Sequence, residues 1–227
     1  FTRPELKVER FSYPVITPSA ARGIFDAIYC KPSKNGREAE FRWEITKIVV
    51  INPPSFIALR RNEVKEKISE GNVKKWMSGK SEVEPILADA DKSITGSDQK
   101  GRTQRQTMAL KNVRYRIHGR ICPWPGFEDR IKGLEAQFQR RAGHGKCIYQ
   151  PYFGCREFPA FFEPVAADEP LPEKAWQESI NIGWMLYDVF DLSQPGTCNS
   201  KPFISLFDAR VVNGVLNIPA FDSAQVL

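Results

Sequence analysis

The chain has 227 residues, of which 41% are hydrophobic, enough for one large domain or two small ones with a proper core. Lysines and arginines number 33 against 27 acids, giving a net charge of +6 and a basic pI of about 9.1. No segment approaches the roughly 20 apolar residues of a membrane helix, and no cationic leader precedes an apolar core. We therefore expect a cytoplasmic protein without a membrane partner.

Two histidines and five scattered cysteines limit the chemistry that is open to this chain. The cysteines are odd in number and form no Cys-x-x-Cys pair, which argues against a zinc site and against a disulfide framework. The sequence also lacks a His-x-x-x-His pair, a carboxylate cluster and a Gly-x-x-x-x-Gly-Lys-Ser/Thr phosphate loop. We expect no metal and no cofactor.

The first predicted elements are a helix and two strands. A helix is predicted over 18–31, because Thr17 is a favourable N-cap and Pro18 suits the first helical position. The alternating run over 41–48 predicts a half-buried strand, and a second strand is predicted over 56–59.

A long polar segment separates these strands from the next ones. Residues 64–101 are predicted to form an insertion or mobile loop, with a short helix near 73–77. Strict alternation over 113–121 predicts a strand with one cationic face, and apolar residues at helical spacing predict a second amphipathic helix over 127–141.

The order helix, strand, strand, loop, strand, helix favours an α+β fold of the ferredoxin-like (RRM-like) type over residues 1–156. One further strand, supplied by the first residues or upstream of Phe1, would complete the pattern, whose sheet is common among RNA-recognition folds.

The last third of the chain has a pattern dominated by strands. Strands are predicted over 158–162, 182–190 and 203–218, and Asn213-Gly214 is typical of a type I′ hairpin turn. A weak helical stretch near 173–179 interrupts them. We predict that residues 157–227 form a small, acidic, antiparallel β domain.

Positive charge is concentrated in one segment. Residues 100–146 hold twelve lysines and arginines against three acids, a net charge of +9, whereas residues 157–227 carry a net charge of −7. Neutralising phosphates with such a segment releases condensed counterions, so the distribution favours a nucleic-acid ligand. Acidic proteins and membranes remain alternatives on charge alone.

Arginines and glutamines clustered at strand ends suit phosphate and base contacts. The cations that we assign to RNA binding are Lys31, Arg60, Arg61, Arg102, Arg105, Arg140, Arg141 and Arg156. His144, in the basic loop that follows Arg141, is either a loop residue or a catalyst. Tyr29, beside Lys31 at the end of the first helix, is either a boundary aromatic or a hydroxyl that relays a proton.

Four blocks of sequence resemble the Cas-five family of CRISPR-associated proteins, subtype I-C (Dvulg). They are Phe1-Thr-Arg-Pro-Glu-Leu-Lys-Val-Glu-Arg10, Thr17-Pro-Ser-Ala-Ala-Arg-Gly23, Leu59-Arg-Arg-Asn-Glu-Val64 and Phe153-Gly-Cys-Arg-Glu-Phe-Pro159. The blocks occur in family order and cover nearly the whole chain. The resemblance implies a RAMP-type fold, with a ferredoxin-like domain followed by a small β domain.

The resemblance also implies an activity. Such proteins cut CRISPR repeat RNA without a metal, use the RNA's own 2′-hydroxyl as nucleophile, and leave a 2′,3′-cyclic phosphate. The protein then stays on the 5′ handle of the guide RNA, together with the other subunits of the type I-C surveillance complex.

The family's catalytic aromatic residue corresponds to Tyr29. Its Lys-His pair follows a glycine at the start of the second helix, where this sequence instead has Ile131-Lys132-Gly133-Leu134. The resemblance thus implies Tyr29 as a catalytic residue. The lysine of the pair occurs one place early, as Lys132, and the histidine is missing. We take Lys132 as the catalytic cation and His144 as the candidate that replaces the missing acid. The alternative is a subunit that binds guide RNA or duplex DNA without cutting.

Overall fold

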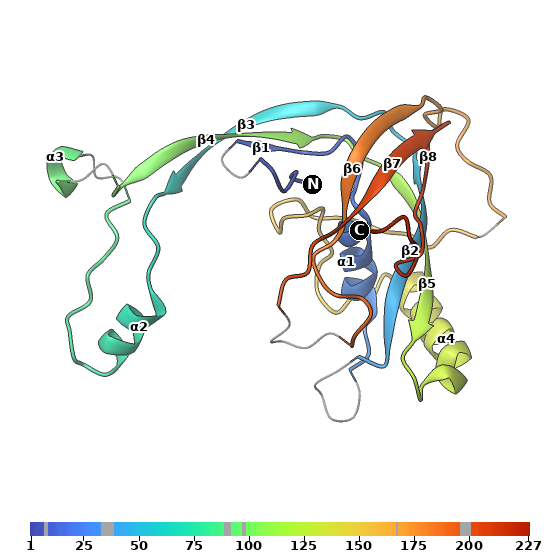
Figure 1. The fold of residues 1–227 in the computed structure, drawn as a ribbon, viewed down its shortest axis with the longest axis horizontal. Helices are drawn as coiled ribbons and strands as arrows, with labels where there is room; N and C mark the ends of the chain where they lie inside the picture. Colours follow the sequence, from blue (N-terminus) through green and yellow to red (C-terminus); the bar gives the residue numbers. More distant parts are fainter. Residues whose placement is uncertain (7–8, 33–38, 89–91, 97–98, 167, 196–200) are drawn as a thin grey trace.

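The computed structural model describes residues 1–6, 9–32, 39–88, 92–96, 99–166, 168–195 and 201–227 (Figure 1). They form a three-stranded sheet, ordered β1-β4-β3, and a five-stranded sheet, ordered β5-β2-β8-β7-β6. The predicted α+β class is confirmed. No helix of the described ranges is long and apolar enough to cross a bilayer.

Helix α1 (Pro18–Ile28) begins where the sequence predicts it. The Thr17 side chain accepts a hydrogen bond from the Ala20 N–H at 3.2 Å, so one of the unpaired amides of the first turn is satisfied. The chain then leaves the helix at Tyr29, whose backbone N–H still donates to Phe25.

Strand β2 (Phe41–Val50) lies inside the five-stranded sheet and pairs antiparallel with β5 (Tyr115–Pro123). The basic strand predicted over 113–121 is thereby confirmed, and it forms one edge of the sheet. The second predicted helix is also present, as α4 (Ile131–Gly143) after the short 3₁₀ turn η1 (Glu128–Arg130).

Helices α1 and α4 cover the same face of the sheet. Phe25 of α1 and Phe138 of α4 stack at 5.6 Å between ring centroids, and both contact Trp43 of β2, at 4.9 and 4.7 Å. This aromatic cluster fixes the end of α1 against the middle of α4, next to the candidate site.

The second sheet forms an arm that arcs away from the body (Figure 1). Strands β3 (Phe56–Val64) and β4 (Arg102–Leu110) pair antiparallel, and β1 (Arg10–Phe11) adds to β4 in parallel. Residues between β3 and β4 carry α2 (Glu70–Met77), as predicted, and the short α3 (Lys92–Thr95).

Strand β4 was not predicted from the sequence, which left residues 102–112 without an assigned element. Its Arg-Thr-Gln-Arg-Gln run is polar throughout and has no alternation of apolar residues, because one face of the arm is open to solvent. Pairing with β3, rather than a hydrophobic pattern, makes this segment a strand. The first residues contribute β1 to the arm and not to the five-stranded sheet.

Strands β6 (Ile180–Asp188), β7 (Ser205–Val212) and β8 (Val215–Asn217) are antiparallel, as predicted. Asn213 and Gly214 have φ angles of 50° and 75°, so the predicted hairpin turn is confirmed. Two other predictions are wrong. No strand spans 158–162, which meets only an isolated bridge at Pro159, and residues 173–179 form no helix, because the Trp176 N–H bonds to the Ile51 carbonyl instead.

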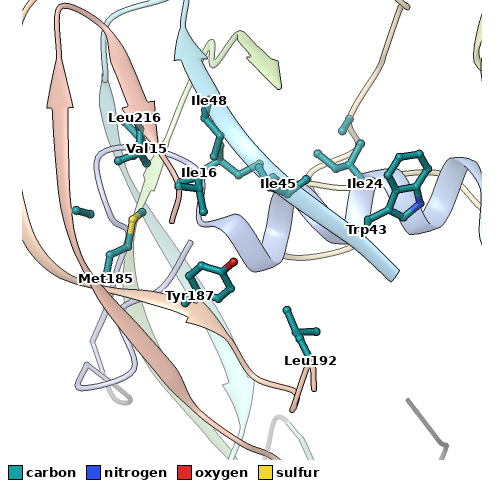
Figure 2. Close-up of a cluster of buried hydrophobic side chains, with 14 of the residues drawn as sticks. Val15, Ile16, Ile24, Trp43, Ile45, Ile48, Met185, Tyr187, Leu192 and Leu216 are labelled. Atoms are coloured by element: carbon teal, nitrogen blue, oxygen red, sulfur yellow. The ribbon is translucent and has the colours of Figure 1, made fainter. Parts of the chain in front are cut away.

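One hydrophobic core draws on both parts of the chain. Figure 2 shows buried side chains from α1, β2, β6 and β8 packed together, including Ile24, Trp43, Ile48, Met185 and Leu216. Strand β8 also pairs directly with β2. The predicted division at residue 156 therefore lies within one continuous sheet and core, and a division into domains stays a prediction.

Candidate functional site

A cavity of about 540 Å³ opens where the end of α1 faces the start of α4. Tyr29 and Lys31 line it from the α1 side, and Asp129 and Arg130 line it from η1. The remaining wall is supplied by Gly133, Leu134 and Gln137 of α4. The structure therefore brings Tyr29 and Lys31, two of the residues predicted from sequence, to one concave site.

Tyr29 is held on several sides. Its carbonyl accepts a hydrogen bond from the Trp43 indole N–H at 2.8 Å, and its ring lies 5.5 Å from that of Phe41. Only 7% of the residue is exposed. Burial raises the pKa of the Tyr29 phenol, and the nearby Glu40 carboxylate raises it further, against an opposing effect of Arg141. Tyr29 therefore presents a protonated hydroxyl at neutral pH.

Two cations of the cavity share one buried carboxylate. Glu40 is 2% exposed, its Oε1 lies 2.9 Å from Arg130 Nη1, and its Oε2 lies 3.2 Å from Lys31 Nζ. A buried carboxylate is costly unless it is paired, so these contacts hold both cations close to the cavity wall.

Sequence reasoning missed Glu40 and Arg130. Glu40 directly precedes a buried strand and Arg130 directly precedes a helix, but the two residues are 90 positions apart in the sequence. A charged residue bordering an apolar run was the only signal, and that signal is common at the ends of surface elements.

The start of α4 differs from the site that the sequence implied. Lys132 is exposed and does not line the cavity, whereas the neighbouring Gly133 does. A Cβ atom on Gly133 would meet nothing within 4 Å, so the glycine leaves open space there. Lys132 contributes positive charge next to the cavity, and the wall itself has no histidine.

The structure does not bring His144 to this site. His144 ends α4, where its Nδ1 lies 2.7 Å from the Arg140 carbonyl oxygen. The twelve-residue separation from Lys132 corresponds to a helix rise of about 18 Å. The two residues therefore lie at opposite ends of α4, and His144 is not among the residues that line the cavity, so its role as the acid stays a prediction.

The two arginines near the end of α4 differ in their contacts. Arg141 Nε donates to the Ile28 carbonyl at 2.8 Å and so satisfies a free acceptor at the end of α1. Arg140 is exposed and donates to Gln137 at 2.5 Å. Arg141 is thus a structural residue next to Tyr29, while Arg140 remains on the surface.

The arm carries the other predicted cations. Arg61 and Arg105 are directly opposite each other on β3 and β4 and share one face. That face is partly neutralised, since Arg61 lies 2.6 Å from Glu157 and Arg105 lies 3.4 Å from Glu63. Arg156, in the adjoining loop, is exposed.

The opposite face of the arm is open to solvent. Cross-strand pairing places Arg60 opposite Gln106 and Arg102 opposite Val64 on this face, and all four residues are exposed. Among the described residues, Arg60 has no ion pair. Exposed Arg and Gln side chains on a two-stranded ribbon suit phosphate and base contacts. Figure 1 shows this arm and α4 at opposite ends of the molecule, so the arm and the cavity are separate surfaces.

No cluster of three or more histidine, cysteine or acidic side chains capable of holding a metal occurs within the described part of the chain. Four cysteines there are free, and Cys198 lies outside the described residues. The cavity is built from one phenol, two cations and an amide, together with Asp129. Such a set binds and orients a phosphate group through hydrogen bonds and charge.

The fold is that of the RAMP-type α+β proteins. The family model for "CRISPR-associated protein (Cas_Cas5)" matches residues 1–219, and the chain belongs to this family.

Two curated relatives match along their length. The chain is 40% identical over 231 residues to the "CRISPR pre-crRNA endoribonuclease Cas5d" of Mannheimia succiniciproducens, covering 100% of this chain and 92% of the relative. It is 32% identical to the protein of the same name from Thermus thermophilus, covering 97% and 86%.

Solved structures agree at the level of the fold. A CRISPR-associated protein matches with a TM-score of 0.58 and 19% identity, over 96% of this chain and 87% of that structure. A functionally uncharacterized protein from Streptococcus mutans matches with a TM-score of 0.55 and 19% identity, over 100% and 90%.

Proposed function

We propose that this chain is a metal-independent endoribonuclease that cuts CRISPR repeat RNA and then stays on the 5′ handle as a subunit of the type I-C surveillance complex. Family membership and two relatives named as pre-crRNA endoribonucleases support the activity. The observation that carries the proposal is the cavity that Tyr29 lines together with Lys31 and Arg130.

The reaction is an internal transfer at one phosphate. The 2′-oxygen forms a bond to phosphorus, the bond to the 5′-oxygen breaks, and one proton is lost from the 2′-hydroxyl while one is gained by the leaving oxygen. The products are a 2′,3′-cyclic phosphate and a 5′-hydroxyl. Negative charge grows on the non-bridging oxygens in the transition state, and cations placed there lower the barrier.

Tyr29 has a role that follows from its protonation. Because burial and Glu40 keep the phenol protonated, it does not serve as a preformed phenolate base. A protonated phenol in this position orients the reacting hydroxyl group or donates a hydrogen bond to an oxygen that gains charge. Lys132 adds positive charge at the start of α4.

The direct test is cleavage of a labelled cognate repeat hairpin by the purified protein in EDTA. We expect one cut with a cyclic-phosphate end, at the rate seen with added Mg²⁺, and a reduced rate in Lys132→Ala. A requirement for a divalent metal would contradict the metal-independent reaction.

The second candidate is a subunit that binds guide RNA or duplex DNA without cutting. The observation that favours it is the Gly133-Leu134 sequence at the cavity wall, where the family's Lys-His pair is absent. Tight binding of the repeat RNA with no cleavage under any metal condition would select this candidate, and competition with duplex DNA would identify its second ligand.

The arm supplies a prediction for RNA binding. We expect Arg60→Ala to weaken affinity for the repeat RNA and to lower the slope of log Kd against log salt concentration by about one, as loss of one phosphate contact does. Arg105→Ala should have the smaller effect, since Glu63 already lies 3.4 Å from Arg105. Filter binding across a salt series measures both, and an unchanged slope in Arg60→Ala would remove the open face of the arm from the RNA interface.

A further inference from the structure

We infer that Glu40 is a positioning residue for RNA cleavage, which holds Lys31 and Arg130 as a two-cation cradle for the phosphate that is cut. The inference rests on the proposed function and adds Glu40 to its site. The ligand of the cavity is then a phosphodiester in RNA. Its donors are the N–H groups of Lys31 and Arg130, which the Glu40 carboxylate holds in place.

The backbone around Glu40 is fixed before its side chain makes any contact. The Glu40 N–H donates to the Lys31 carbonyl at 2.8 Å, and the Glu40 carbonyl accepts from the Trp124 N–H at 3.0 Å. Glu40 thereby joins the segment after α1 to the segment after β5. Its carboxylate lies where side chains from both segments meet.

The carboxylate uses only part of the hydrogen-bonding capacity of its partners. Arg130 Nη1 donates a hydrogen bond to Glu40 Oε1 at 2.9 Å. Glu40 Oε2 lies 3.2 Å from Lys31 Nζ, an ion pair that does not have the geometry of a hydrogen bond. A lysine has three N–H donors and an arginine five. Donors therefore remain on both cations for a ligand in the cavity.

The exposure of the three side chains supports a role beyond folding. Glu40 is 3% exposed at its side chain, but those of Lys31 and Arg130 are 43% and 46% exposed. The carboxylate is buried, while both cations reach the cavity that they line. Free lysine and arginine side chains lose rotamer entropy when they bind a ligand, and anchoring them beforehand lowers that cost.

Asp129 is the other acid at the cavity. It is exposed, so water and salt screen its charge more strongly than that of the buried Glu40 carboxylate. Counting Asp129 and Glu40 against Lys31 and Arg130 gives a formal charge of zero, so the cradle acts through the placement of its N–H donors, which stabilise a phosphate that gains charge in the transition state.

The test compares Glu40→Gln with Glu44→Gln. Glu44 is also a buried acid, 5% exposed, but its partner Arg120 does not line the cavity, whereas both cations held by Glu40 do. Single-turnover cleavage is measured for each variant, together with Kd for a repeat RNA whose reactive 2′-hydroxyl is replaced by hydrogen. We expect cleavage by Glu40→Gln to fall roughly 100-fold, as displaced catalytic groups do, with little change in Kd. Glu44→Gln should cut as wild type does.

A second pair of variants separates positioning from folding. If Glu40 acts through the cations, Glu40→Gln should cost little further activity in a Lys31→Ala background. Arg130→Lys, which keeps the charge and loses the planar fork, should lower cleavage with Kd retained. Thermal melting checks that each variant is folded. If Glu40→Gln does not fold, the cleavage rate of Arg130→Lys tests whether the cation cradle is needed.

The outcomes distinguish this inference from the proposed function. Cleavage at the wild-type rate by Glu40→Gln or by Arg130→Lys overturns the cradle while the nuclease stands. An equal loss in Glu40→Gln and Glu44→Gln also overturns it, because burial rather than position would then matter. A wild-type protein that binds the repeat and never cuts overturns both.

Discussion

Replacing Tyr29 by phenylalanine should lower the single-turnover rate of repeat-RNA cleavage by roughly 10²- to 10⁴-fold, the range associated with loss of a group that handles a proton. The ring contact with Phe41 and the backbone bond from Trp43 do not involve the hydroxyl group, so both survive the change. RNA affinity and melting temperature should therefore stay near their wild-type values. The measurement is cleavage of an end-labelled repeat hairpin in EDTA by the wild type and by Tyr29→Phe, with RNA binding measured in parallel.

The pH dependence of the same reaction tests how Tyr29 acts. A free tyrosine ionises near pH 10, and burial and the Glu40 carboxylate raise the pKa of Tyr29 above that value. Between pH 7 and about 10, the wild-type rate should accordingly show no decline from loss of the phenolic proton. A rate that instead follows formation of a phenolate in this interval would mean that Tyr29 is a base.

Tyr187→Phe is the matched control. Tyr187 is buried, and its hydroxyl group donates to the Pro219 carbonyl at 3.0 Å, away from the cavity residues. Removing that hydroxyl group should leave cleavage unchanged. If Tyr29→Phe and Tyr187→Phe cut equally well, the catalytic centre does not lie at the end of α1.

Asp188→Ala should reduce the free energy of unfolding by about 3–5 kcal/mol, the usual cost of leaving one partner of a buried ion pair alone. Asp188 is 1% exposed and accepts hydrogen bonds from Arg22 Nε and Nη2 at 2.8 and 3.0 Å. It also accepts from the backbone N–H groups of Val189 and Phe190. The change removes the bond between α1 and β6. It leaves a buried guanidinium whose remaining ion-pair partner, among the described residues, is Asp26. Urea denaturation measures the difference.

An exposed ion pair on the neighbouring strand is the control. Asp208 lies 2.8 Å from Arg210 on β7, but both side chains are largely exposed, and such pairs contribute about 0–1 kcal/mol. Asp188→Ala should therefore lower the free energy of unfolding several times as much as Asp208→Ala. Equal losses would contradict a stabilising role for the buried Arg22–Asp188 ion pair.

The shape of the unfolding transition tests the domain organisation. Two separate transitions in the wild type would support domains divided at residue 156, whereas one transition would indicate a single cooperative unit.

Local signals in the sequence predicted many of the elements. Thr17 and Pro18 predicted the start of α1, alternation predicted β2 and β5, and Asn213-Gly214 predicted the turn between β7 and β8. Each of these signals acts within a few residues of the chain. A cap, a pleat or a tight turn satisfies its own backbone groups or buries its own face, so it leaves a pattern that can be read without the rest of the protein.

The cavity could be predicted only in part. Tyr29 was expected there because the resemblance places the family's catalytic aromatic residue at the end of the first helix, and Lys31 was expected as an RNA-binding cation. Both residues line the cavity. Glu40 and Arg130 were not expected, and His144 was expected and lies at the other end of α4. The long-range pairing of a buried acid with a distant cation leaves no periodic signal in either segment.

The sequence alone thus determined the α+β class, the basic middle segment and the main helices, because these depend on composition and on neighbours along the chain; Tyr29 was assigned through the family resemblance. The tertiary structure decided which strand pairs with which, including β4 with β3 and β8 with β2. It also decided which charges share a buried carboxylate. Those contacts join residues tens of positions apart, and they form only when the core between α1, β2 and α4 brings the segments together.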